Sequence, residues 1–89
     1  MSSTIDGKRD NKTLKKDISV NIRKYRKERH FTQEELAEYA EISYDFMRRI
    51  ETTNGKCGFS VYTLYKLALA LNVTMDDLAK SIIEYSEQK

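Results

Sequence analysis

The chain has 89 residues, a formal net charge of +2, one cysteine and one histidine. A chain of this length is expected to form one small domain, and a lone cysteine excludes an internal disulfide. The single cysteine and histidine also exclude a zinc site of Cys and His ligands, and no apolar run approaches the roughly 18 residues of a membrane span. We therefore expect a cytoplasmic protein without metal or cofactor.

The charges are unevenly distributed along the chain. Residues 8–29 hold ten Lys or Arg and three acids, whereas residues 30–51 hold two Lys or Arg and six acids. A basic stripe suits a polyanion such as nucleic acid, but a run of charge can also be only a solvated helix face. Composition alone leaves both readings open.

The N-terminal part of the chain is predicted to be an arm followed by a helix. Residues 1–14 are mostly polar and show no apolar period, so we expect a flexible arm. Residues 15–29 carry Ile18, Ile22 and Tyr25, which have the i, i+4, i+7 spacing of an amphipathic helix. Basic side chains occupy its other face.

One capping pattern then recurs four times: an apolar residue, a hydroxyl residue, and a second apolar residue four positions into a helix. The four sets are Phe31-Thr32-Leu36, Ile42-Ser43-Met47, Phe59-Ser60-Leu64 and Val73-Thr74-Leu78. Each hydroxyl is a predicted N-cap, and each apolar pair is a hydrophobic staple. Four further helices follow, so residues 15–89 are predicted to form one all-α, five-helix domain of repressor-like type without strands.

The ends of these helices carry matching signals. Asn54-Gly55 follows the third helix, and glycine readily takes the left-handed conformation that closes a helix. His30 and Asn72 tolerate positive φ and are expected to end the first and fourth helices. The second helix ends at Ala40-Glu41, where no glycine is present.

The second and third helices, at about 33–40 and 44–53, are joined by so tight a turn that they must cross steeply, as in a helix-turn-helix. On the third helix, Phe46, Met47 and Ile50 share the face assigned to the core. The outward set is Tyr44, Asp45, Arg48, Arg49 and Thr52. Such a set suits the DNA major groove, where arginine can bind guanine bidentately and aspartate can accept from the cytosine amino group.

The run TQEELAEYAEISYDFMRRIETTNG, followed by YTLYKLALALNVTMDDL, resembles the Cro-like phage-repressor family, also called the xenobiotic response element (XRE) type. The resemblance covers about residues 18–80 and implies a dimer that binds operator DNA with its third helix in the major groove. By position, it implies a groove-facing set, phosphate contacts and one structural salt bridge. The groove-facing set is Ser43, Tyr44, Asp45, Arg48 and Arg49; the phosphate contacts are Gln33 and Lys56, the latter with the Asn54 and Gly55 amides; the salt bridge joins Arg26 to Glu51.

The fourth helix carries two apolar stripes. Val61, Leu64, Ala68 and Leu71 form the predicted inward stripe. A helix that is apolar on two sides is usually buried on two sides, which predicts a dimer interface. That interface comprises Tyr62, Tyr65 and Leu69 of the fourth helix with Ile82, Ile83 and Tyr85 of the fifth, which is expected to extend past the matched region. Alternatively, Ile82 and Tyr85 complete the monomer core and the tyrosines lie flat on the surface.

The predicted function is that of a sequence-specific transcriptional regulator, which binds a palindromic double-stranded operator as a homodimer. The alternative is an antitoxin or protein-interaction module on the same fold, whose protein partner would bind the tyrosines or an acidic face. That face comprises Glu34, Glu35, Glu38 and Glu41. The sequence offers no nucleophile and base pair and no phosphate-binding glycine loop, so we expect no enzyme. Cys57 and His30 receive no chemical role.

Overall fold

A computed structural model describes residues 10–82 of the chain. Over these residues the fold is entirely helical, and the prediction of five helices is confirmed. The helices are α2 (Asn11–Glu28), α3 (Gln33–Ala40), α4 (Tyr44–Thr52), α5 (Val61–Leu71) and α6 (Met75–Ala79). Within this part of the chain, no helix combines the length and the apolar character needed to cross a membrane.

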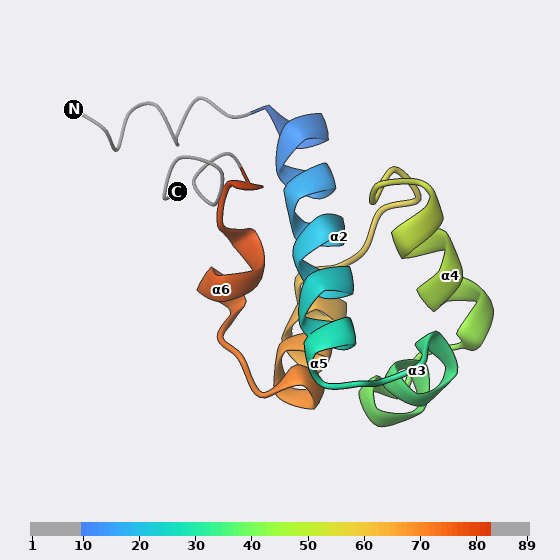
Figure 1. Cartoon of the computed structure of the whole chain (residues 1–89). Coiled ribbons are helices and arrows are strands. Elements are labelled where there is room, and N and C mark those ends of the chain that lie inside the picture. The colour runs from blue at the N-terminus through green and yellow to red at the C-terminus, as the bar shows by residue number, and fades with distance from the viewer. Residues whose placement is uncertain (1–9, 83–89) are drawn as a thin grey trace.

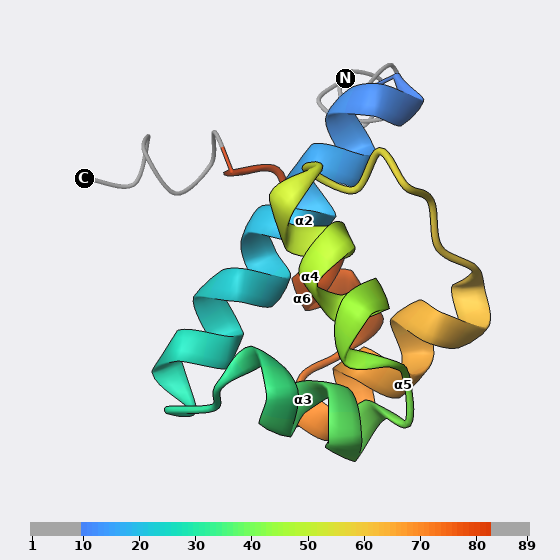
Figure 2. The ribbon, with the colours of Figure 1, turned by 90° about the vertical axis from the view of Figure 1, so that its right-hand side faces the viewer.

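The longest helix, α2, forms the spine of the domain. It runs through the middle of the molecule between α6 on one side and α4 on the other (Figure 1) and packs against both. The short α3 lies across one end of the domain, where it contacts both α4 and α5 (Figure 2). The α3–α4 pair is the predicted helix-turn-helix.

The start of α2 corrects the predicted arm. The helix begins at Asn11, so the expectation that residues 1–14 form a flexible arm is wrong for residues 11–14, while residues 1–9 lie outside the described part. Asp10 is the N-cap, and its carboxylate accepts a hydrogen bond of 2.7 Å from the Thr13 N–H. That bond holds the pKa of Asp10 below its ordinary value. The sequence reading missed this cap because lysines separate it from the apolar stripe.

The four predicted N-caps are all confirmed. Thr32, Ser43, Ser60 and Thr74 have extended backbones, and each side chain accepts from the N–H three residues later. The predicted capping box at the start of α3 is present, and α6 has a second box, in which Asp77 reciprocates Thr74. Each cap satisfies an N–H that the first helical turn leaves without a partner.

The ends of α2, α3, α4 and α5 are closed by left-handed residues, most of them as predicted, whereas α6 ends in the extended residue Lys80. His30 and Asn72 have φ of 61° and 60°, and Asn54 follows α4 with φ of 54°. Glu41 closes α3 with φ of 61° although it has a side chain. A non-glycine residue in this region is strained by roughly 1–2 kcal/mol, so the packing around the turn must impose it.

Gly55 lies where the end of α4 meets α2. A Cβ at this position would lie 2.6 Å from the Lys15 carbonyl oxygen, and φ is +79°. Only glycine therefore lets the chain leave α4 this close to α2. The Gly55 N–H also donates to the Ile50 carbonyl at 3.0 Å and closes the helix.

The core brings together apolar side chains from all five described helices. Those with no exposed surface are Ile22, Leu36, Ala40, Met47, Ile50, Leu67, Leu71 and Leu78. The assignment of Val61 to the inward stripe of the fourth helix is wrong, because this residue is 73% exposed. It is the first residue of α5 and borders an open groove of about 240 Å³ toward the start of α2, so no element among residues 10–82 covers it.

Two buried polar side chains of α2, which the sequence analysis did not identify, tie the helices together. The Ser19 hydroxyl donates to the Ile50 carbonyl at 2.8 Å, near the end of α4. The Asn21 amide donates to the carbonyls of Leu78 and Lys80, each at 2.8 Å. Because a buried polar group without a partner is costly, these bonds fix where α4 and α6 lie along α2.

Candidate nucleic-acid interface

The helix α4 has one face in the core and one on the surface, where it lies at the front of the domain (Figure 2). Met47 and Ile50 have no exposed surface, and Phe46 packs partly buried against the core. On the other face the exposed fractions of the side chains are 68% for Asp45, 52% for Arg48 and 56% for Arg49. The three charged side chains thus point to solvent, as expected, and their contact with DNA stays a prediction.

The N-terminal end of α4 is also open. The Ser43 hydroxyl accepts from the Phe46 N–H at 3.0 Å and serves as the N-cap. Tyr44 is 47% exposed, and its ring centroid lies 5.8 Å from the guanidinium carbon of Arg48. Thus Tyr44 packs against an arginine on the outer face rather than against the core.

Asp45 lies between the two arginines of the outer face. Its carboxylate accepts a hydrogen bond of 3.1 Å from Arg49 Nε, and Arg48 Nη1 lies 3.8 Å away. An exposed i,i+4 pair of this kind contributes only about 0.3–0.5 kcal/mol to stability. The pair therefore has little effect on folding.

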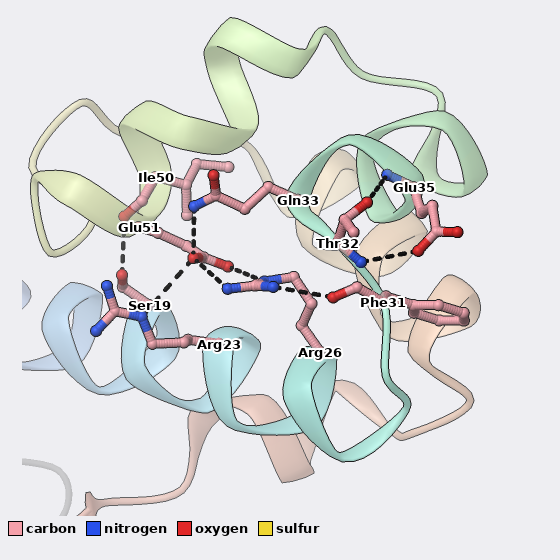
Figure 3. Close-up of polar contacts among 9 residues, drawn as sticks. All are labelled: Ser19, Arg23, Arg26, Phe31, Thr32, Gln33, Glu35, Ile50 and Glu51. Atoms are coloured by element: carbon pink, nitrogen blue, oxygen red, sulfur yellow. Dashed lines mark hydrogen bonds and ion pairs between the residues drawn. The ribbon is translucent and has the colours of Figure 1, made fainter.

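The inner side of α4 is anchored by a buried carboxylate. The Glu51 side chain has no exposed surface and is contacted by three residues (Figure 3). Arg26 forms a two-pronged contact, with Nε 2.8 Å and Nη2 3.1 Å from the two oxygens. Arg23 Nε lies 3.7 Å from Oε1. This is the Arg26–Glu51 pair that the family resemblance implied, and it joins α2 to α4.

Gln33, the predicted phosphate contact of α3, takes part in the same network. Its Nε2 donates to Glu51 Oε1 at 2.8 Å (Figure 3). Arg26 also donates to the Phe31 carbonyl at 2.9 Å, just before α3. The start of α3 is therefore held in a fixed position relative to α4. Whether Gln33 also contacts phosphate stays a prediction.

The loop after α4 holds the implied phosphate contacts of Lys56 and of the Asn54 and Gly55 amides. The Gly55 N–H is bonded to Ile50 and the Lys56 N–H donates to the Thr53 carbonyl at 3.1 Å. The Gly55 amide therefore takes part in ending the helix, and the contact of this loop with phosphate stays a prediction. The Lys56 side chain is exposed beside it, as is Cys57.

Two members of the acidic face have partners within the domain. Glu35 accepts from the Thr32 N–H in the capping box at 2.9 Å. Glu41 pairs with Lys66 of α5 at 2.6 Å, which holds the pKa of Glu41 below its ordinary value and raises the pKa of Lys66. These two acids therefore help to cap α3 and to join its end to α5, and a contact of the acidic face with a protein partner stays a prediction.

The described residues contain no candidate metal-binding site. Among residues 10–82, no group of three His, Cys, Asp or Glu side chains is arranged to hold an ion.

The sequence analysis did not identify Arg23 and Lys66, whose acidic partners Glu51 and Glu41 lie far away in the chain. No local pattern marks such pairs.

The comparisons with known proteins agree with this geometry. Residues 21–83 match the family model described as the Cro/C1-type HTH DNA-binding domain, which is more than half of the chain. The chain belongs to the Cro/C1-type helix-turn-helix family. It therefore has a DNA-binding fold, and α3 and α4 form its helix-turn-helix.

One solved structure, described as that of the hypothetical transcription factor NHTF from Neisseria, has the same fold. The TM-score is 0.75 and the sequence identity 22%, and the alignment covers 91% of this chain and 91% of that one. No curated protein matches the chain. At this identity the structural likeness supports the fold, and the family match supports DNA binding.

The buried Glu51 network predicts a large effect on stability. Replacing Glu51 with Ala leaves Arg26 without its partner, which should lower the free energy of unfolding by about 3–5 kcal/mol. Urea unfolding monitored by circular dichroism measures the change. The matched control is Glu28→Ala, which removes the exposed Lys24–Glu28 pair and should change stability by about 0.2–1 kcal/mol. Equal effects of the two substitutions would contradict the anchoring role.

Proposed function

We propose that the protein is a sequence-specific transcriptional regulator that binds a palindromic operator as a homodimer. One observation carries the proposal: α4 is fixed by buried groups on its inner side and presents two arginines, a tyrosine and an aspartate on its outer side. In helix-turn-helix proteins the second helix of the motif enters the major groove. In a two-fold dimer the half-sites would lie about 34 Å apart.

The proposed contacts divide into base reading and phosphate binding. Arg48 and Arg49 have free guanidinium edges for guanine, with Tyr44 and Ser43 beside them at the exposed start of the helix. Lys56 and the basic residues of α2 would neutralise phosphates, which supplies affinity but little discrimination. Gln33 would bind a phosphate from the start of α3.

The proposed dimer surface lies on α5 and α6. Tyr62, Tyr65 and Leu69 are 66%, 49% and 62% exposed. Tyr65 and Leu69 border a groove of about 290 Å³ that reaches Val73 and Met75 at the start of α6. A contiguous apolar patch of this kind usually marks an interface, and a second copy of the chain could cover it through a self-complementary contact. Ile82 is half-buried, and Ile83 and Tyr85 lie outside the described residues.

Substitution of a proposed base contact and substitution of a proposed phosphate contact should have different effects on DNA binding. Arg49→Ala should weaken binding to the preferred duplex by about 1–3 kcal/mol and relax the preference at one base pair. Lys56→Ala should weaken binding to all duplexes alike and flatten the salt dependence. Fluorescence anisotropy with duplexes selected from a randomised library, at several salt concentrations, measures both. The same profile for the two variants would refute the division between base and phosphate contacts.

The dimer surface makes a separate prediction. Leu69→Asp places a charge in the exposed apolar patch and should convert a dimer to a monomer, with loss of binding to a two-half-site duplex. Val61→Asp is the matched control, because Val61 is even more exposed on the same helix but lies outside the proposed surface. Sedimentation equilibrium measures the oligomeric state of the unmodified protein and of each variant. A monomeric unmodified protein would show that this patch serves another partner or none, and equal behaviour of the two variants would place the interface elsewhere.

A further inference from the structure

The two arginines of the outer face of α4 are restrained to different degrees. Arg49 Nε donates to Asp45 Oδ2 at 3.1 Å, and its guanidinium carbon lies 6.0 Å from the Phe46 ring centroid. Arg48 has only an ion pair of 3.8 Å with the other oxygen of Asp45 and a contact with the Tyr44 ring. The Asp45 carboxylate therefore holds one guanidinium by a hydrogen bond and the other only by charge.

The atom that Asp45 binds determines what Arg49 can still donate. A guanidinium has five N–H groups in one plane, and Nε carries one of them. With the Nε–H directed at Asp45, Nη1 and Nη2 each keep an N–H bond that points away from Nε. These two N–H bonds are parallel and free to donate. Two parallel N–H donors are what the O6 and N7 acceptors of guanine require in the major groove.

We propose that Asp45 is a positioning residue that determines specificity by orienting Arg49 for bidentate contact with guanine. The inference rests on the proposed function and replaces the expectation that Asp45 itself accepts from a cytosine amino group. Its carboxylate oxygens already face two guanidinium groups in the free protein. Reading cytosine would require the carboxylate to leave Arg49, whereas orienting Arg49 requires no rearrangement.

Because Asp45 is negatively charged, its removal should have opposite effects on affinity for DNA and on base-pair specificity. A carboxylate near DNA repels phosphates, so its removal should strengthen binding to duplexes of any sequence. A freed Arg49 side chain samples several rotamers, so the same removal should weaken discrimination at the base pair that Arg49 reads. Affinity and specificity should therefore change in opposite directions.

The experiment begins with a randomised duplex library, from which the unmodified protein selects its preferred site. The base pair whose preference disappears in Arg49→Ala is taken as the position that Arg49 reads. Affinities for the preferred duplex, for its three single-base-pair variants at that position and for an unrelated duplex are then measured by anisotropy at fixed salt. Asp45→Ala should reduce the preference at that position about tenfold, within the range of one bidentate contact. Binding to the unrelated duplex should not weaken.

Two further variants separate geometry from charge. Asp45→Asn loses the charge but keeps an oxygen that can accept from Arg49 Nε, so it should retain most of the preference. The preference at that position is already lost in the Arg49→Ala background, so there Asp45→Ala should cause no further loss of preference at any position of the selected site. Thermal unfolding of each variant checks that the fold is intact. Because Asp45 is exposed, its replacement should lose only the small stabilisation that a carboxylate gives to the first turn of α4.

Each contrary result has a defined meaning. A uniform gain in affinity with an unchanged preference would reduce Asp45 to a repulsive charge and overturn the inference. A loss of preference at another position, caused by Asp45→Ala both with and without Arg49, would show that Asp45 reads a base directly, which also overturns it. If the unmodified protein selects no sequence from the library, the proposed function itself fails.

Discussion

The position of α4 depends on one buried carboxylate. Glu51 is enclosed between α2, α3 and α4, and a buried charge without partners is so unfavourable that Arg26 and Gln33 must stay bonded to it. A helix of nine residues is marginal on its own, so its orientation comes from this docking and from the burial of Met47 and Ile50. Since all of these anchors lie on one side, the arginines of the other side remain exposed without loss of stability.

The local features of the fold could be predicted from the sequence because their chemistry is contained within a few residues. A hydroxyl such as Ser43 satisfies the N–H three positions later, and this relation is visible in the sequence alone. The four caps, the helix ends at His30 and Asn72, and the outward side of α4 all follow from such patterns. The salt bridge between Arg26 and Glu51 came instead from a family resemblance, because no local spacing connects two residues that are 25 positions apart.

Most of the features that sequence reasoning missed depend on what lies nearby in space. Asn21 reads as one more polar residue of an amphipathic helix, yet it is fully buried and holds the end of α6. Val61 fits an apolar stripe, but none of the described elements covers the first turn of α5. Asp45 has the right chemistry to read a base, and its i,i+4 spacing to Arg49 permits the hydrogen bond that the structure contains. Helical periodicity identifies a face, and tertiary packing decides which part of that face is covered.

The central claim is that α4 is held from within and reads DNA with its outer arginines. NMR spectroscopy of arginine side-chain Nε–H signals tests it directly, with the protein alone and bound to its selected duplex. The signals of Arg48 and Arg49 should shift on binding to DNA, while the signal of Arg26 should stay in place because its Nε remains bonded to Glu51. A shift at Arg26 with unchanged signals from Arg48 and Arg49 would contradict it.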